Sequence, residues 1–244
     1  REIIPQYNKW EIEQEYPETL EQALRPSEEK SFFDVKALED MLLQVQSPLK
    51  DFDGFDTHNG LVRAYKPPIL GRKYIIFTDP SMGIEDPFVT VVMDAVTGEG
   101  VCTATGMIPA TQVVAIHDQL VRNYNNAYNT GEVNAQAGQS FVDGITSMNT
   151  PNQAPRRSVE GKIIPSKKGW ITAQPLREKS LADLKEAVRT QLITIHDRDC
   201  IEAFRCFMVE RVVDQTGKVK TKSVGKAHDD WIMAWAGAWQ IRKY

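Results

Sequence analysis

Acidic residues stand beside apolar segments at three widely separated places in this chain of 244 residues. Asp79 ends the apolar run 74–79, Glu132 follows a glycine in the middle of the chain, and Asp229 and Asp230 open an apolar helix. Mg²⁺ binds through a few carboxylates together with substrate phosphate oxygens. Two such ions about 4 Å apart would hold the attacking and leaving oxygens of a phosphodiester. The residue types therefore predict metal-dependent phosphodiester hydrolysis.

The elements that must position these acids predict an α/β fold. Apolar, β-rich runs at 74–79, 88–94 and 100–105 are joined tightly, which is typical of an antiparallel meander. The polar segment 125–132 makes a poor strand. Helices and strands alternate in the rest of the chain, which indicates a mixed sheet with helices on both faces. The expected helices are 109–124, 138–148, 178–191, 199–207 and 229–241, and the expected strands are 162–164, 192–196, 208–213 and 218–224.

The first 70 residues form an expected extension that stands outside the sheet. This stretch is acidic and punctuated by prolines, and its only regular element is a short amphipathic helix at about 35–45. The core is expected to begin at Tyr74. We therefore divide the chain into an extension, 1–70, and a catalytic domain, 71–244. The start at Arg1 rather than Met suggests a fragment or a processed product.

Charge is distributed unevenly along the chain, although the net charge is only −4. Residues 1–60 carry 6 Lys and Arg against 14 Asp and Glu, whereas residues 156–226 carry 16 against 9. A basic region beside an acidic cluster fits a site that holds phosphates near metal-binding carboxylates. The alternative is a solvated face that is basic by coincidence.

Each acid also has a purely structural interpretation. Asp79 could close an Asx-turn on its own backbone, and Glu132 could be an exposed loop residue. Asp229 and Asp230 could cap their helix, where the dipole stabilises negative charge. Asp86, in the loop after the first strand, is a weaker candidate for completing a second metal site.

Basic residues in the second half of the chain are candidates for DNA contact. Alternating lysines in the 218–224 strand would share one face, although lysines on an edge strand also protect against aggregation. Lys179 could be a cation near the scissile phosphate. The full set of candidates is Arg156, Arg157, Lys167, Lys168, Lys179, Lys218, Lys220, Lys222 and His228.

Several other function classes lack their motifs. The sequence has no Gly-x-Ser-x-Gly nucleophile motif and no P-loop for ATP. No apolar run approaches the ~18 residues of a membrane span. Nothing resembles a module that reads the major groove, so sequence specificity is expected to be low.

Short motifs in a characteristic order resemble the large terminase subunit of tailed bacteriophages over nearly the whole chain. The resemblance rests on the following segments: Glu13–Pro17, Glu21–Leu24 and Ser31–Asp34, like the exit from that family's ATPase domain; Thr78-Asp79-Pro80 with Gly83 and Asp86; Glu132-x-Asn134, followed by Gly138; Gly169-Trp170-Ile171-Thr172 with Lys179; the Gly217-Lys218 turn; and His228-Asp229-Asp230-Trp231-Ile232-Met233-Ala234.

This resemblance implies a ribonuclease-H-like nuclease domain without the ATPase domain. It implies two Mg²⁺ or Mn²⁺ ions held by Asp79, Glu132 and one of Asp229 or Asp230, and cleavage of concatemeric double-stranded viral DNA during genome packaging. The implied partners are DNA, the portal protein and the small terminase subunit, with no membrane. The implied location is the host cytoplasm, transiently at the procapsid.

Two alternatives share the same residues. A Holliday-junction resolvase or transposase-like nuclease would use the same acids on branched DNA. A non-catalytic module that docks on DNA or on a portal ring would keep the fold without needing a metal.

Overall fold

The computed structural model describes residues 31–244 apart from 51–54, 159–161, 214–218 and 225–228. Its centre is a five-stranded mixed sheet in the order β1-β4-β3-β2-β5. These strands are β1 (Val62–Ala64), β2 (Tyr74–Asp79), β3 (Phe88–Asp94), β4 (Gly100–Gly106) and β5 (Tyr128–Gly131). All neighbours are antiparallel except β2 and β5, which run parallel. The predicted meander and mixed sheet are confirmed.

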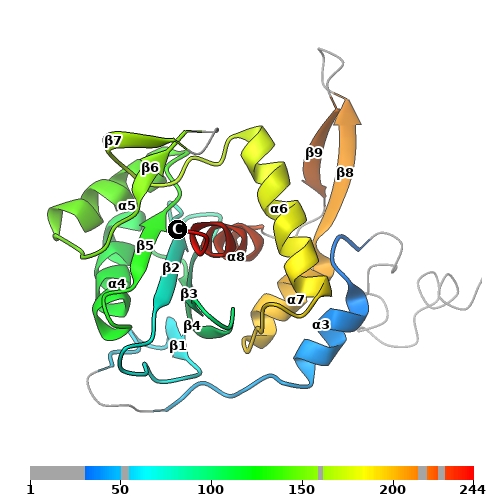
Figure 1. Ribbon diagram of the computed structural model, residues 1–244, viewed down its shortest axis with the longest axis horizontal. Coiled ribbons are helices and arrows are strands. Elements are labelled where there is room, and N and C mark those ends of the chain that lie inside the picture. Colours follow the sequence, from blue (N-terminus) through cyan, green and yellow to red (C-terminus); the bar gives the residue numbers. More distant parts are fainter. Residues whose placement is uncertain (1–30, 51–54, 159–161, 214–218, 225–228) are drawn as a thin grey trace, which may run out of the picture.

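Helices cover both faces of the sheet, as predicted (Figure 1). α4 and α5 pack together on one face, and α8 packs on β2 and β3 from the other, with α6 against α8. α3 and α7 extend this second layer. The helices are α3 (Val35–Leu42), α4 (Ala110–Asn123), α5 (Gln136–Ser147), α6 (Gln174–Arg189), α7 (Arg198–Cys206) and α8 (Asp230–Ile241).

Two small antiparallel hairpins complete the described part of the chain. β6 (Pro155–Arg157) pairs with β7 (Ile163–Lys168), and β8 (Met208–Val213) pairs with β9 (Val219–Val224). The predicted segment 192–196 is not a strand, and only Thr194 makes a parallel bridge, to Glu99. A single bridge leaves its remaining backbone groups outside the sheet ladder.

The alternation of side chains along β2 divides the core into two layers. Ile75 and Phe77 join the cluster with α8, α6, α7 and α3, whereas Tyr74 and Ile76 join the cluster with α4 and α5. Successive residues of a strand point to opposite faces. Asp79 is therefore in phase with Phe77, on the α8 face.

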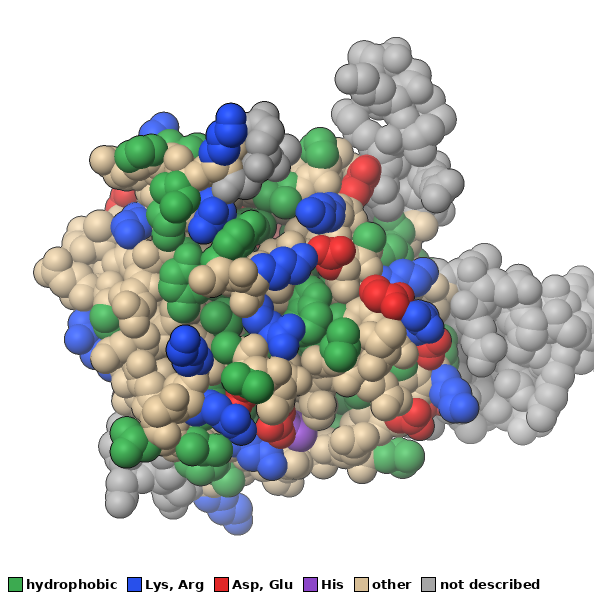
Figure 2. All heavy atoms as spheres, viewed as in Figure 1, with side chains coloured by type: hydrophobic (Ala, Val, Ile, Leu, Met, Phe, Trp, Pro, Cys, Tyr) green, Lys and Arg blue, Asp and Glu red, His purple; other side chains and the backbone are tan. Residues whose placement is uncertain are grey.

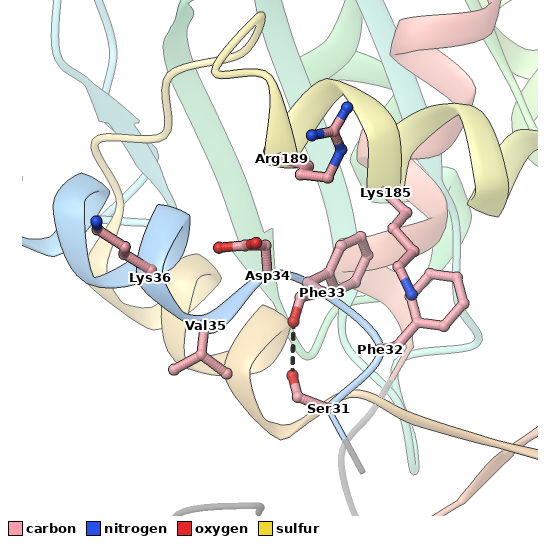
Figure 3. Close-up of a pocket in the computed structure, with 8 residues that line it drawn as sticks. All are labelled: Ser31, Phe32, Phe33, Asp34, Val35, Lys36, Lys185 and Arg189. Atoms are coloured by element: carbon pink, nitrogen blue, oxygen red, sulfur yellow. Dashed lines mark hydrogen bonds between the residues drawn. The ribbon is translucent and has the colours of Figure 1, made fainter. Parts of the chain in front are cut away.

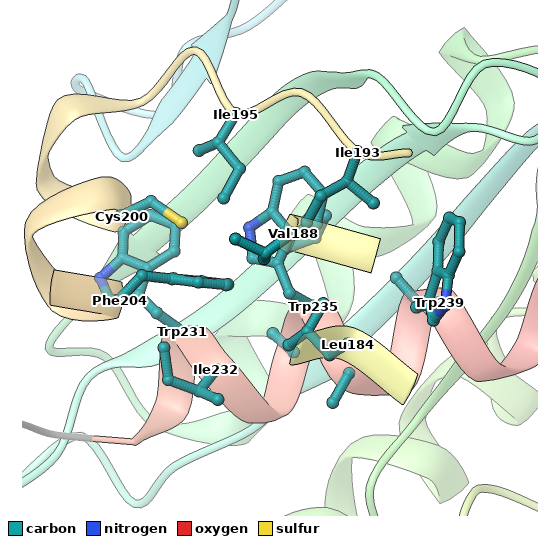
Figure 4. Close-up of a cluster of buried hydrophobic side chains, with 14 of the residues drawn as sticks. Leu184, Val188, Ile193, Ile195, Cys200, Phe204, Trp231, Ile232, Trp235 and Trp239 are labelled. Carbon is teal, nitrogen blue, oxygen red and sulfur yellow. The ribbon is translucent and has the colours of Figure 1, made fainter. Parts of the chain in front are cut away.

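α8 fixes the geometry of the first of these layers. Every residue from Trp231 to Ile241 is buried, as its all-round apolar sequence predicts. Trp235 and Trp239 project from it among the aliphatic and aromatic side chains of α6, α7 and the segment after α6 (Figure 4). A β-carbon at Gly237 would lie 2.4 Å from the ring of Phe77, so only glycine lets α8 approach β2 this closely.

The expectation that residues 1–70 stand outside the sheet is wrong for residues 62–64. β1 pairs with β4 at the sheet edge. Phe33, Leu38 and Met41, from the segment around α3, are buried in the core with α7. These two elements give weak sequence patterns, since β1 is a three-residue edge strand and α3 buries a single face. No described helix has the length and apolarity to cross a bilayer.

Candidate metal centre

Asp79 is the last residue of β2. This strand lies between β3 and β5, and its residues are buried up to Asp79, which is partly accessible. The strand order thus places this carboxylate at the end of a rigid element, flanked by strands on both sides. A side chain fixed in this way is a suitable metal ligand because it needs no rearrangement.

Glu132 lies beside Asp79 because β5 runs parallel to β2. The register pairs Thr78 with Gly131, and the Glu132 amide donates a hydrogen bond to the Thr78 carbonyl over 3.0 Å. One residue further, Asp79 and Glu132 are adjacent, and their carboxyl groups hydrogen-bond to each other. The polar approach to Glu132 is a strand after all, since pairing with β2 outweighs the low β propensity of its Asn and Thr residues.

The backbone around Glu132 is fixed by three neighbours. A β-carbon at Gly138 would lie 2.3 Å from the Glu132 carbonyl oxygen, so the first turn of α5 can sit here only with glycine. Trp170 exchanges backbone hydrogen bonds with Gly131 and Val133. The Asn134 side chain clasps the backbone of Thr172 through two hydrogen bonds of 2.9 Å.

Asp229 and Asp230 come from the start of α8. Asp229 stands at the N-cap position, yet its side chain makes no capping hydrogen bond there. Its Oδ2 instead accepts a hydrogen bond from Arg177 of α6 over 2.6 Å. The capping interpretation therefore does not explain Asp229. Because α8 packs on β2, both aspartates are close enough for their charges to act on Asp79.

The four acids form one electrostatic unit. Burial raises the pKa of Asp79 well above its usual range, and the charges of Glu132, Asp230 and Asp229 raise it further. Burial also raises the pKa of Glu132, against the opposing effects of a hydrogen bond from Thr172 and the charge of Arg177. Without a metal, Asp79 and Glu132 therefore retain a proton between them to higher pH than isolated carboxyls.

This donor set fits hard divalent cations. All four candidate ligands are carboxylates, which suit Mg²⁺ and Mn²⁺ rather than the softer ions that prefer thiolate or imidazole. In the described part of the chain, no three acidic, His or Cys side chains converge as a ready-made ligand set for one ion.

A buried polar layer supports the two strand ends from the α4 face. The Thr78 hydroxyl hydrogen-bonds to Thr90 and to Nδ1 of His117, each over 2.8 Å. Nε2 of His117 contacts Oδ1 of Asn129 over 3.1 Å. Burial lowers the pKa of His117 to about 4, so the ring is neutral near physiological pH. This layer connects β2, β3 and β5 directly beneath Asp79 and Glu132.

The remaining predicted metal ligand and DNA-binding residues are dispersed. Asp86 is exposed in the loop between β2 and β3. Lys179 is exposed on α6, where its charge acts on Asp183. Figure 2 shows Lys and Arg scattered across this face of the molecule rather than gathered in one patch. Lys220 and Lys222 lie on β9, while Lys218 and His228 fall outside the described residues.

The basic residues of the β6–β7 hairpin already have intramolecular contacts. Arg156 Nε donates to the Lys168 carbonyl over 2.7 Å, and Lys168 Nζ donates to the Gln153 carbonyl over 3.1 Å. The Arg157 guanidinium lies 3.7 Å from the centre of the Tyr244 ring. Lys167 is exposed. DNA contact by the first three would therefore replace or share these bonds.

Arg177 is a site residue that the sequence did not reveal, whereas Thr172 was noted only as part of the motif 169–172. Thr172 hydrogen-bonds to Glu132, and Arg177 to Asp229. The sequence directed attention to Lys179 instead, two residues after Arg177. Residues two positions apart in a helix differ by about 200° around its axis. Arg177 and Lys179 therefore point to opposite sides of α6, and only the orientation of the helix decides which of them faces the acids. The position of Arg177 ahead of the predicted helix start at 178 hid this signal.

One cavity in the described structure lies apart from these acids. It has a volume of about 360 Å³ and is lined by residues 31–36 together with Lys185 and Arg189 of α6 (Figure 3). Its charged rim contains none of the predicted metal ligands. Lys185 lies over the Phe32 ring at 5.0 Å, which is a cation–π distance.

Comparison with known proteins identifies the fold. No family model matches the chain, and no curated protein matches it by sequence. The nuclease of the large terminase from thermophilic phage G20c, solved with bound magnesium, superposes with a TM-score of 0.64 at 20% identity, over 86% of this chain and 97% of that one. The fold is that of a large terminase nuclease domain.

Two further solved structures agree. The cobalt-bound G20c nuclease gives the same TM-score of 0.64 and the same coverages at 20% identity. The large terminase nuclease domain of Thermus phage P74-26 gives 0.57 at 19% identity, over 83% of this chain and 93% of that one. The predicted ribonuclease-H-like α/β class is therefore confirmed, together with the resemblance to large terminase nuclease domains.

Proposed function

We propose that this chain is a divalent-metal-dependent endonuclease that cuts concatemeric double-stranded viral DNA during genome packaging. One observation carries the proposal: three elements distant in sequence bring Asp79, Glu132, Asp229 and Asp230 close enough for their charges to act on one another. Function resides in such a site rather than in the fold. The bound metals of the similar nucleases support the same chemistry.

In the proposed mechanism Asp79 and Glu132 would hold the metal ions from the sheet, and Asp229 or Asp230 would hold them from α8. Two Mg²⁺ or Mn²⁺ ions would supply a hydroxide nucleophile near neutral pH and stabilise the departing 3′ oxygen. The chain's own contribution is orientation. The parallel pairing of β2 with β5 sets the spacing of two carboxylates, and the Asn134 clasp and Gly138 fix the backbone of the second.

The proposed partners follow from this activity. Double-stranded DNA is the substrate, and the basic residues of β6–β7, α6 and β9 are proposed to contact its phosphates. The portal protein and the small terminase subunit are proposed partners of the full-length protein, and no membrane is proposed as a partner. The proposed place of action is the host cytoplasm, transiently at the procapsid.

Plasmid digestion tests the proposal. Wild-type protein is expected to nick and linearise plasmid in Mn²⁺ or Mg²⁺ and to leave it intact in chelator. Asp79→Ala is expected to abolish cleavage while circular dichroism and the unfolding transition show a folded protein. Cutting by the folded variant at the wild-type rate contradicts the site assignment. Preference for four-way junctions over linear duplex would favour a resolvase instead.

A further inference from the structure

Arg177 places a positive charge directly on one of the candidate metal ligands. It lies in the first turns of α6, and its Nη2 donates to Oδ2 of Asp229 over 2.6 Å. The Arg177 side chain is only 16% exposed. Its charge also reaches Glu132. One guanidinium therefore acts on acids delivered by two elements, β5 and α8.

The ion pair and a metal ion would compete for the same carboxylate. The distance of 2.6 Å between Arg177 Nη2 and Asp229 Oδ2 is short even for a charge-assisted hydrogen bond, so this contact holds one of the two carboxylate oxygens. A divalent ion that takes Asp229 as ligand lies within a few ångströms of the guanidinium, and like charges at that separation repel. The Asp229 side chain is 37% exposed, so the carboxylate can exchange partners without opening the fold.

We propose that Arg177 is a positioning residue that holds Asp229 in the metal-free protein and turns to the DNA phosphate when Asp229 becomes a metal ligand. The inference rests on the proposed nuclease function. A guanidinium suits the second role because its planar fork of donors matches two phosphate oxygens. Its attachment to a helix packed on α8 keeps it beside the site in both states.

Calorimetric titration with Mn²⁺, without DNA, separates this role from a structural one. Arg177→Gln is expected to bind Mn²⁺ about tenfold more tightly than wild type, because a competing positive charge is gone. DNA cleavage at saturating Mn²⁺ is expected to fall about tenfold or more. Arg189→Gln is the matched control: it makes the same change on the same helix, at an arginine paired with Glu186, and should leave Mn²⁺ affinity unchanged.

The outcomes are distinguishable. Unchanged or weaker Mn²⁺ binding by Arg177→Gln overturns the inference, and so does an equal gain in Arg189→Gln, which would indicate a general charge effect. Arg177→Met keeps an unbranched stem in the half-buried position and replaces Arg177→Gln if that variant does not fold. Failure of wild type to bind Mn²⁺ overturns the proposed function itself, before any variant is compared.

Discussion

Two aspartates of this chain, Asp79 at the end of β2 and Asp197 at the N-cap of α7, have opposite surroundings. The Asp197 side chain is 1% exposed, and its carboxylate accepts hydrogen bonds of 2.8 Å from Tyr65 and Thr103. It also forms an ion pair with Arg63 at 3.3 Å and accepts hydrogen bonds from backbone amides at the start of α7. Asp79 is surrounded by three further carboxylates instead.

The difference separates a carboxylate whose partners the chain supplies from one that the chain surrounds with like charges. Burying a charge is costly unless the protein supplies partners. At Asp197 the chain supplies them itself, and the carboxylate joins β1, β4 and α7. At Asp79 the chain adds like charges, which raises the free energy of the metal-free fold. Under the proposed function, a bound divalent cation would offset this cost.

The largest expected effect is that the same Asp→Asn change alters protein stability in opposite directions at Asp197 and Asp79. In chelator at neutral pH, Asp197→Asn should lower the free energy of unfolding by about 3 kcal/mol, because it breaks a buried hydrogen-bonded network. Asp79→Asn should raise the unfolding temperature, since it removes a charge from a repelling cluster. Urea and thermal unfolding measure both. Destabilisation by both variants would show that Asp79 is a structural carboxylate like Asp197.

The sequence predicted the strand and the helix whose ends carry the candidate acids Asp79 and Asp230. Asp79 closes an unmistakable apolar strand, and Asp230 begins a helix that is apolar all round. β5 was missed as a strand because its partner β2 provides the stabilisation, and β1 because it is a three-residue edge strand. Such elements depend on contacts between residues far apart in sequence, which local patterns do not encode.

The Asp197 network was not predicted at all. Its members Arg63, Tyr65, Thr103 and Asp197 are common residues on three separate segments without a shared motif. Arg177 escaped notice for the same reason. Metal ligands can be recognised from the sequence because their chemistry demands a particular residue type. Satisfied partners of buried groups can be almost any donor, and only the fold selects them.

The second prediction concerns the ligand that the sequence left most open. Glu132→Gln keeps the shape of the side chain but removes the charge that a divalent ion needs. Cleavage at limiting Mn²⁺ should fall about a hundredfold and recover partly at high Mn²⁺, because a weakened site can be refilled by mass action. Digestion rates across a Mn²⁺ series measure this.

The control for Glu132→Gln is Glu99→Gln. It removes a partly exposed carboxylate that contacts His196, away from the four candidate ligands. It should leave the Mn²⁺ dependence of cleavage unchanged. A flat response of Glu132→Gln at every Mn²⁺ concentration would transfer the second ligand position to another acid, with Asp86 the first candidate.

The smallest effect is on the pH dependence of stability, and it concerns the raised pKa of Asp79. The pKa of Asp79 is higher in the folded than in the unfolded protein, so the folded state binds more protons. Stability from this group is present at acidic pH and is lost as pH rises through the folded pKa. His117, with its pKa lowered to about 4, acts oppositely, because its contribution to stability is lost as pH falls below the ordinary His range.

Urea unfolding of wild type and Asp79→Asn in chelator, from pH 5 to 9, isolates the Asp79 effect, because the His117 contribution is the same in both proteins and cancels. The variant's advantage should grow with pH until Asp79 is fully ionised, whereas in Mn²⁺ the advantage should reverse, because metal binding releases the same proton and strengthens as pH rises. An advantage that is constant across this range would mean that Asp79 carries its charge in the metal-free fold at every pH, as a satisfied carboxylate does.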